Sequence, residues 1–276
     1  MKIRIVFIAL IVFGANLMAQ TNSYYDWVDH SAIYVERNEL DSAAYALQQA
    51  IKMEPTNENN NLLLLNLGVM QRQLRWVDDA YISFTAALRN NDNPTLVLHN
   101  RASLLCDMGK FDEAMEDYNE IIRTDHEDVE AFYRRGLLFL ERNQRAEAET
   151  DFMRAEQIDP NDLFTKLSRA LRYKLEDRWE EAEVVYTDII KNEEPVIPAY
   201  FLNRAECYVN TNRFGKAAAD LREVEKEQRN NPYFYILRGR LRLDQYDKFA
   251  AKADFERAKK LGYDAQLADE WIAKTK

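Results

Sequence analysis

The sequence contains little glycine, proline or cysteine: 7 Gly, 6 Pro and 2 Cys among 276 residues. It also lacks any long polar or Ser/Gly-rich tract, while apolar residues make up 47% and charged residues 30% of the chain. These features exclude a disordered chain. They indicate a folded, helix-rich protein with enough apolar side chains to bury a core.

Positive charge is also scarce, with 37 Lys and Arg against 47 Asp and Glu and a net charge of −10. Without Lys2 and Arg4 the net charge is −12. Binding to nucleic acid depends on Lys and Arg that neutralise phosphates. The charge therefore argues against a nucleic-acid partner and disfavours anionic membrane surfaces.

Residues 1–19 differ from the rest of the chain. Lys2 and Arg4 precede an apolar run from Ile5 to Phe13, and small residues follow up to Ala19. This order is typical of a secretory signal peptide, and the run is shorter than the roughly 20 apolar residues of a membrane span. We expect cleavage before Gln20 and an exported, periplasmic protein. The alternative is an uncleaved anchor, the only case in which we expect membrane association.

A period of 34 or 35 residues runs through the remaining chain. Octets such as "NLLLLNLG", "VEAFYRRG" and "PYFYILRG" end in a small residue, and an alanine follows twelve residues later. The small residues are Gly68, Ala102, Gly136, Ala170, Ala205 and Gly239, and a divergent first copy has Ser31 at the same place. Such a period indicates a repeat architecture.

Helix packing explains the small residues. Each unit contains two apolar patterns with helical spacing, which predict a pair of amphipathic helices. Gly or Ala at a crossing lets two helices approach closely, so we expect Gly136 and Ala148 to be the two sides of one crossing. The prolines fall at unit junctions, where they stop helices, and Ser23 with Asp26 predicts a first N-cap. Gly262 is expected to end the last repeat.

These residues resemble the tetratricopeptide repeat, a 34-residue helix–turn–helix motif. Residues 129–162 match its pattern at Phe132, Gly136, Phe139, Ala148, Phe152, Ala155 and Pro160. The resemblance implies an all-α fold: a right-handed α-solenoid of about seven repeats with a concave groove lined by the first helix of each repeat. The expected tetratricopeptide repeat domain is 20–276, with repeats at about 24–60, 61–94, 95–128, 129–162, 163–197, 198–231 and 232–265 and a capping helix at 266–276. Pentatricopeptide repeats have a similar length but bind RNA, which the acidity disfavours.

Residues for catalysis or metal binding are not apparent. The three histidines share no metal-ligand spacing, and a role for His99 in the groove wall is favoured over ligation. There is no phosphate-binding loop and no nucleophile elbow. We therefore predict a non-enzymatic protein with no cofactor, no metal and no small-molecule substrate. Cys106 and Cys207 lie three repeats apart and are predicted to be unpaired.

The expected binding site is the concave groove, with a protein or peptide as its partner. The family uses Asn at the sixth place of a repeat to hold a ligand backbone, although Asn is also simply common there. The family's carboxylate clamp is in doubt because Leu65 and Val69 occupy two of its places. The predicted peptide-binding residues are Asn66, Asn100, Tyr133, Arg134, Leu137, Phe164, Leu167, Leu171, Asn203 and Tyr233.

Two functions remain open from the sequence. The apolar residues of the middle groove favour a scaffold of the cell envelope that binds a partner's peptide or helix, because exposed apolar patches commonly mark interaction sites. Tight curvature that partly buries these residues would explain them equally well. The alternative function is a structural subunit, or a homo-oligomer, that docks through its convex face and end helices. Trp271 would serve this alternative, although it is more simply explained as sealing the last repeat.

Overall fold

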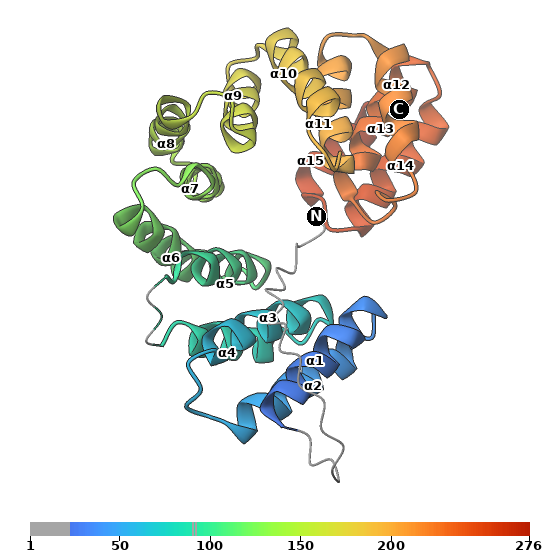
Figure 1. Cartoon of the computed structure of the whole chain (residues 1–276). Coiled ribbons are helices and arrows are strands. Elements are labelled where there is room, and N and C mark those ends of the chain that lie inside the picture. The colour runs from blue at the N-terminus through green and yellow to red at the C-terminus, as the bar shows by residue number, and fades with distance from the viewer. Residues whose placement is uncertain (1–22, 90, 92) are drawn as a thin grey trace. The chain divides into compact units, whose positions relative to one another are not determined.

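The computed structural model describes residues 23–89, 91 and 93–276. These residues form fifteen α-helices and no strand, which confirms the predicted all-α fold. The chain falls into two compact units, which meet in sequence between Arg142 and Asn143, and each unit is described here by itself (Figure 1). The predicted signal peptide lies outside the described residues.

Each unit is a stack of helix hairpins, in which an A helix is followed by a B helix. The helices of unit 1 are α1 (Tyr24–Glu36), α2 (Leu40–Met53), α3 (Asn60–Gln73), α4 (Val77–Ala87), α5 (Thr95–Asp107), α6 (Phe111–Thr124) and α7 (Val129–Glu141). Those of unit 2 are α8 (Arg145–Ile158), α9 (Leu163–Leu175), α10 (Trp179–Asn192), α11 (Pro198–Asn210), α12 (Phe214–Val224), α13 (Pro232–Asp244), α14 (Lys248–Lys260) and α15 (Ala265–Ala273). The helix pairs follow the predicted repeats, and the unit boundary falls between the A and B helices of repeat 129–162.

The first helix begins at the predicted cap. The Ser23 hydroxyl accepts a hydrogen bond from the N–H of Asp26 at 3.2 Å, and the Asp26 carboxylate accepts one from the N–H of Ser23 at 2.7 Å. This reciprocal pair is a capping box, which satisfies N–H groups that have no partner inside the helix.

The A helices end at a left-handed residue, which we number place 15 by counting from the first residue of each repeat. The N–H of the following residue bonds back to a carbonyl five residues earlier, as from Trp76 to Gln71 and from Arg213 to Tyr208, both at 2.8 Å. This is the Schellman motif, which ends a helix and lets the chain reverse into the B helix. The place-15 residues, all with positive φ, are Asn38, Arg75, Gly109, Asn143, Asp177, Asn212 and Tyr246.

In the repeats that lie within one unit, the small residues lie at the helix crossings, whereas the predicted contact of Gly136 with Ala148 joins residues of different units and stays a prediction. Those at places 8 and 20 are buried in all seven repeats. A Cβ atom on Gly68 would lie 2.6 Å from the ring of Phe84, and one on Gly239 would lie 2.5 Å from the ring of Phe255. Both rings occupy place 24, so one detail of the prediction needs correction. At these two crossings the atoms nearest the small residue belong to the place-24 ring and not to the alanine at place 20.

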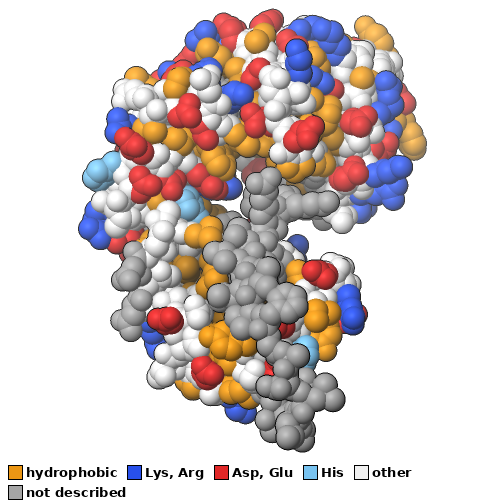
Figure 2. Space-filling view, viewed as in Figure 1, with side chains coloured by type: hydrophobic (Ala, Val, Ile, Leu, Met, Phe, Trp, Pro, Cys, Tyr) orange, Lys and Arg blue, Asp and Glu red, His pale blue; other side chains and the backbone are white. Residues whose placement is uncertain are grey.

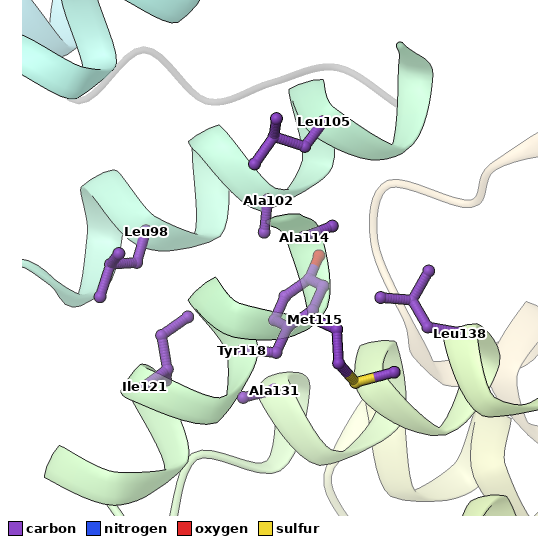
Figure 3. Packing of buried hydrophobic residues seen from close by; sticks show 9 residues of the cluster. All are labelled: Leu98, Ala102, Leu105, Ala114, Met115, Tyr118, Ile121, Ala131 and Leu138. Carbon is purple, nitrogen blue, oxygen red and sulfur yellow. The ribbon is translucent and has the colours of Figure 1, made fainter. Parts of the chain in front are cut away.

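The core of repeat 95–128 shows the same packing with alanine at place 8. Figure 3 shows Ala102 of α5 directed toward Ala114 and Tyr118 of α6, with Leu98 and Leu105 on either side. Ala131 and Leu138 from the next repeat complete this cluster. One hairpin cannot bury its own apolar face, so stacking supplies the rest of the core. Full burial of one such leucine stabilises the fold by roughly 1.5–3 kcal/mol.

An ion pair inside the repeat was not foreseen from the sequence. Arg101 forms a two-pronged hydrogen bond with Asp117 at 2.6 and 2.9 Å, and Arg204 does the same with Asp220 at 2.8 Å. Arg238 and Asp254 repeat the arrangement at 2.8 and 3.1 Å. The aspartate side chains are only 4–7% exposed, and the fork geometry suits a carboxylate. The signal was present as Arg at place 7 and Asp sixteen residues later.

The last repeat is closed by α15, as predicted. Trp271 stacks on Phe255 with 5.7 Å between ring centroids, while Arg240 and Lys274 lie 5.1 and 3.8 Å from the centroid of the indole. The helix α15 thus covers the apolar face that a neighbouring repeat would otherwise bury. The helix spans 265–273 where 266–276 was expected, and Gly262 has the left-handed φ of 96° expected after α14.

The prolines behave in two ways. Pro198 and Pro232 are the first residues of α11 and α13, so the prediction that every junction proline stops a helix is wrong for these two. The first helical position has no N–H partner inside the helix, and the fixed φ of proline suits it. The other four lie outside the helices.

Candidate protein-binding surface

The A helices of unit 2 carry a linked set of polar side chains. Lys174 of α9 donates a hydrogen bond to the side-chain oxygen of Asn203 on α11 at 2.9 Å and forms an ion pair with Glu206 one turn further on. Glu206 is only 9% exposed, and a buried charge needs such a partner. Lys174 lies at place 12 of one repeat and its partners at places 6 and 9 of the next. The link therefore follows the repeat register.

Tyr233 of α13 extends this set. Its hydroxyl bonds to Glu206, and its pKa is raised, first by burial and then by the charge and hydrogen bond of Glu206. On the same helix Arg240 donates to Asn210 of α11 at 2.8 Å. These bonds hold the side chains of three successive A helices in defined positions, which reduces the entropy lost when a ligand binds.

The A helices of unit 1 carry a smaller polar set. Asn100 donates to the carbonyl of Leu96 in its own helix at 2.8 Å, which orients its amide and leaves the side-chain oxygen to accept a ligand N–H. Arg134 and Glu130 form an ion pair at 2.9 Å along α7. Arg72 of α3 reaches the next repeat, where it pairs with Asp107 at 2.6 Å.

His99 is a half-buried residue of the A helix α5. Its Nε2 lies 2.9 Å from Asp128, while its buried Nδ1 has no hydrogen-bond partner in the part of the chain that the structure describes. Burial alone would raise the pKa of Asp128, but the bond and charge of His99 and the N–H of Ala131 bring it below its usual value. A single histidine tied to the cap of α7 fits the expected role in the groove wall.

The ten predicted residues divide equally between the units. Unit 1 holds Asn66, Asn100, Tyr133, Arg134 and Leu137, and unit 2 holds Phe164, Leu167, Leu171, Asn203 and Tyr233. Nine of them are half-buried, but Asn66 is only 5% exposed, which leaves little of its amide for a ligand.

The apolar members are partly covered by the core. Leu167 packs against the cluster formed with Ala170 and Tyr186, and Tyr233 packs against the clusters on both sides of α13. Such partial burial is what we expected if the apolar residues of the middle groove serve packing and not only binding. The unit 2 face therefore combines a fixed polar set with half-buried apolar side chains.

A cleft of unit 1 lies elsewhere, between the α2–α3 loop and the α4–α5 connection. Its volume is about 1070 Å³, and Asn57, Asn60, Leu64, Arg89 and Leu96 are among its lining residues. None of the ten predicted residues lines it. Part of its polar rim serves the fold, since Asn60 donates to the carbonyl of Glu54 at 2.7 Å. The signal in the sequence was the Asn-rich insertion "EPTNENNN".

Within 23–89, 91 and 93–276, no three His, Cys, Asp or Glu side chains converge as metal ligands do, and no helix is long and apolar enough to span a membrane. Both cysteines are free thiols. Burial raises the pKa of Cys207 to about 12, so this thiol stays protonated and unreactive near neutral pH.

Comparison with known proteins supports the repeat assignment. A sequence model of the tetratricopeptide repeat matches residues 99–162 and 169–232. A tetratricopeptide repeat protein from Parabacteroides merdae, known from its crystal structure, is 32% identical with a TM-score of 0.69. The alignment covers 91% of this chain and 98% of that protein. A search of curated proteins finds no match.

More distant structures share the fold. One chain of the Cut9–Hcn1 hetero-tetramer of APC/C is 11% identical with a TM-score of 0.70, and the match covers 92% of this chain and 52% of that one. PilF of Pseudomonas aeruginosa is 17% identical with a TM-score of 0.57, over 76% of this chain and 94% of its own. At these identities the likeness concerns the helix-pair architecture alone.

Proposed function

Because the chain belongs to the tetratricopeptide repeat family, whose fold generally serves as a non-enzymatic interaction scaffold, we propose that it binds a protein partner through its A helices. The ligand is a peptide segment or a helix of that partner. Recognition requires no covalent step, since the side chains are presented by a packed framework.

The linked polar set of unit 2 carries this proposal. Lys174, Asn203, Glu206 and Tyr233 come from three successive A helices and fix one another through short bonds. Side-chain amides both donate and accept, so Asn203 and Asn100 suit the backbone of a bound segment. Half-buried Leu167 and Leu171 supply apolar contacts beside them.

Site-specific crosslinking tests the proposal. A photoreactive residue at Leu167 or Leu171 should capture the same partner from a cell-envelope extract, because both lie on α9, an A helix of unit 2. The same residue at Val184, an exposed position of the B helix α10, is the control. Capture of that partner from Val184 alone would contradict the proposal.

Substitution provides a second test. Tyr133→Ala combined with Leu167→Ala should abolish capture without changing the helical circular dichroism signal. Ile82→Ala with Val184→Ala removes exposed apolar side chains of two B helices and should leave capture intact. Undiminished capture by the first pair would remove the A helices from the binding site.

We further propose that the protein works outside the cytoplasm, in the periplasm. The support is the order of charge, apolar run and small residues in 1–19. N-terminal sequencing of the protein from its native cell should then begin at Gln20. A mature chain that retains Met1 would favour the uncleaved anchor.

The structural-subunit alternative also has an observation in its favour. Tyr246, in the turn between α13 and α14, and Phe249, in the first turn of α14, are among the most exposed aromatic side chains of the described residues. Trp271 supports it less, since its ring is stacked on Phe255 and covered by two cations. A photoreactive group that crosslinks from Phe249 to a second copy of the chain would favour this alternative over the A-helix scaffold.

A further inference from the structure

The A–B turn of the last repeat differs from the same turn in the other six. At place 15 it has Tyr246, with a φ of 62°, where three other repeats have asparagine and the rest have Arg, Gly or Asp. At place 18, in the first turn of α14, the last repeat has Phe249, where the others have Asp, Glu, Ala or Gly. The two rings are 89% and 87% exposed. An aromatic side chain is a poor choice for a left-handed position, so the fold does not explain Tyr246.

A groove runs beside this turn on α12 and α13. It has a volume of about 280 Å³ and includes Gln245, the residue before Tyr246. Its floor is apolar, formed by Leu221, Phe234 and Leu241. A groove of this size accommodates one or two side chains of a partner.

Three arginines line the groove: Arg222, Arg238 and Arg242. Arg238 is neutralised by Asp254 and by Glu225, at 2.8 and 2.7 Å, and Arg242 also pairs with Asp254, at 2.7 Å. Arg222 is exposed and has no ion pair within the part of the chain described here. The groove therefore retains one guanidinium that is free to meet an anion.

The part of the sequence that contains the groove also has more positive than negative side chains. Residues 198–276 contain 16 Lys and Arg against 12 Asp and Glu, although residues 20–142 contain 11 against 21. Figure 2 shows Lys and Arg side chains gathered at the outer edge of unit 2 in that view. Surface charges act over about 8–10 Å in physiological salt, so an acidic partner responds to this local excess and not to the net charge of the chain.

We propose that this groove and turn form a second binding surface, which takes an acidic protein segment carrying aromatic or long aliphatic side chains. An apolar side chain of the segment enters the groove, a carboxylate pairs with Arg222, and Tyr246 and Phe249 pack against the flanking residues. The guanidinium fork matches a carboxylate, and Tyr and Arg are the residue types most enriched at binding hot spots. A flat lipid surface would leave the groove empty. The surface includes part of α13 but none of the ten predicted peptide-binding residues, so its test does not depend on the proposed function.

Binding to an acidic aromatic polymer tests this proposal. The full chain should bind a fluorescent poly(Glu,Tyr) copolymer more tightly than polyglutamate of the same length, by at least tenfold. Arg222→Glu and Phe249→Asp should each weaken copolymer binding by at least tenfold, and Tyr246→Asn should weaken it several-fold. Asn is the common residue at place 15, so this last variant should also keep or raise the melting temperature.

Matched variants control for charge and exposure. Arg154→Glu reverses an exposed arginine of α8, and Tyr45→Asn removes an exposed ring of α2. Both should bind the copolymer as the unmodified chain does. Equal binding of copolymer and polyglutamate would overturn the proposal, as would equal weakening by the control variants. Loss of phosphatidylglycerol vesicle binding in Phe249→Asp, with copolymer binding unchanged, would assign the turn to a lipid surface instead.

Discussion

Repeats 61–94 and 198–231 follow the same two-helix plan but fill equivalent places differently. At places 7 and 23 the first has Leu67 and Ser83, and Ser83 donates to Gln71 at 2.7 Å. The second has the buried pair Arg204 and Asp220. Place 23 thus joins the A helix through a neutral hydrogen bond to place 11 in the first repeat and through an ion pair to place 7 in the second. The polar contact is interchangeable as long as every buried group has a partner.

At the helix crossings of these two repeats, a smaller residue at place 8 is matched by a larger one at place 24. Gly68 lies against the ring of Phe84, whereas Ala205 shares its crossing with the smaller Leu221. Across the chain, glycine at place 8 occurs with phenylalanine at place 24 in three repeats, and alanine occurs with tyrosine or leucine in the other three after the first. The pair of residues must fill the crossing, so neither place can be judged alone.

The asparagines at place 6 show that the same place in two repeats can have different exposure and different partners. Asn66 is buried, whereas Asn203 is half-buried and accepts a hydrogen bond from Lys174 of the preceding repeat. Neighbouring repeats decide the exposure of this amide.

The largest expected effect concerns the buried ion pair. Asp220→Ala leaves Arg204 without its main partner and should lower the free energy of unfolding by about 3 kcal/mol, measured by urea unfolding. Ser83→Ala removes the neutral equivalent and should cost about 1 kcal/mol. Equal costs for the two variants would mean that the ion pair is no more important than the hydrogen bond.

Overpacking a crossing comes next. Ala205→Leu places three extra carbons between α11 and α12 and should destabilise the protein by about 2 kcal/mol. Ala253→Leu adds the same atoms at an exposed position of α14 and should change little. If Ala205→Leu leaves the melting temperature unchanged, the helix contact at this place is contradicted.

A single methyl group gives a sharper version of that test. Gly68→Ala brings a Cβ against the Phe84 ring, and the strain should outweigh the helical preference of alanine, for a net loss of about 1 kcal/mol. In the double variant Gly68→Ala with Phe84→Leu, which copies the pair of repeat 198–231, the costs should be less than additive. Gly215→Ala is the control, because a Cβ there meets nothing within 4 Å, and it should stabilise α12 slightly.

The smallest expected effect is a gain in stability. Arg75 has a φ of 64° at place 15, where repeat 198–231 has Asn212. Arg75→Asn should raise stability by up to about 1 kcal/mol, because asparagine tolerates the left-handed conformation better. Asn212→Arg should lower it by a similar amount. A stabilising effect of both substitutions in thermal unfolding would show that place 15 does not control this turn.

Much of the fold could be predicted because the signal recurs. The spacing of Gly68 and Ala80, repeated along the chain, predicted the helix pairs and their crossings, and Ser23 with Asp26 predicted the first cap. The Arg101–Asp117 type of ion pair was missed, since helix-face arguments treat charges as exposed unless two elements are known to meet. Arg222 was missed for a different reason: the groove that it lines forms only where α12 and α13 pack together.

The candidate site was less predictable. The places predicted to face a ligand follow from the repeat register, and nine of the ten predicted residues are half-buried. The exposure of Asn66 and the link from Lys174 to Glu206 depend on how far one repeat turns relative to the next. Small differences in packing at each helix crossing determine this rotation between repeats.

The sequence by itself determined the helix pairs, their order and the small residues where they cross, because these follow from local periodicity and side-chain volume. Tertiary structure alone decided which polar residues are buried and paired, which asparagine stays accessible and where a groove opens beside an exposed aromatic turn. Those properties arise between neighbouring repeats, where one side chain's environment is made by residues about 30 positions away.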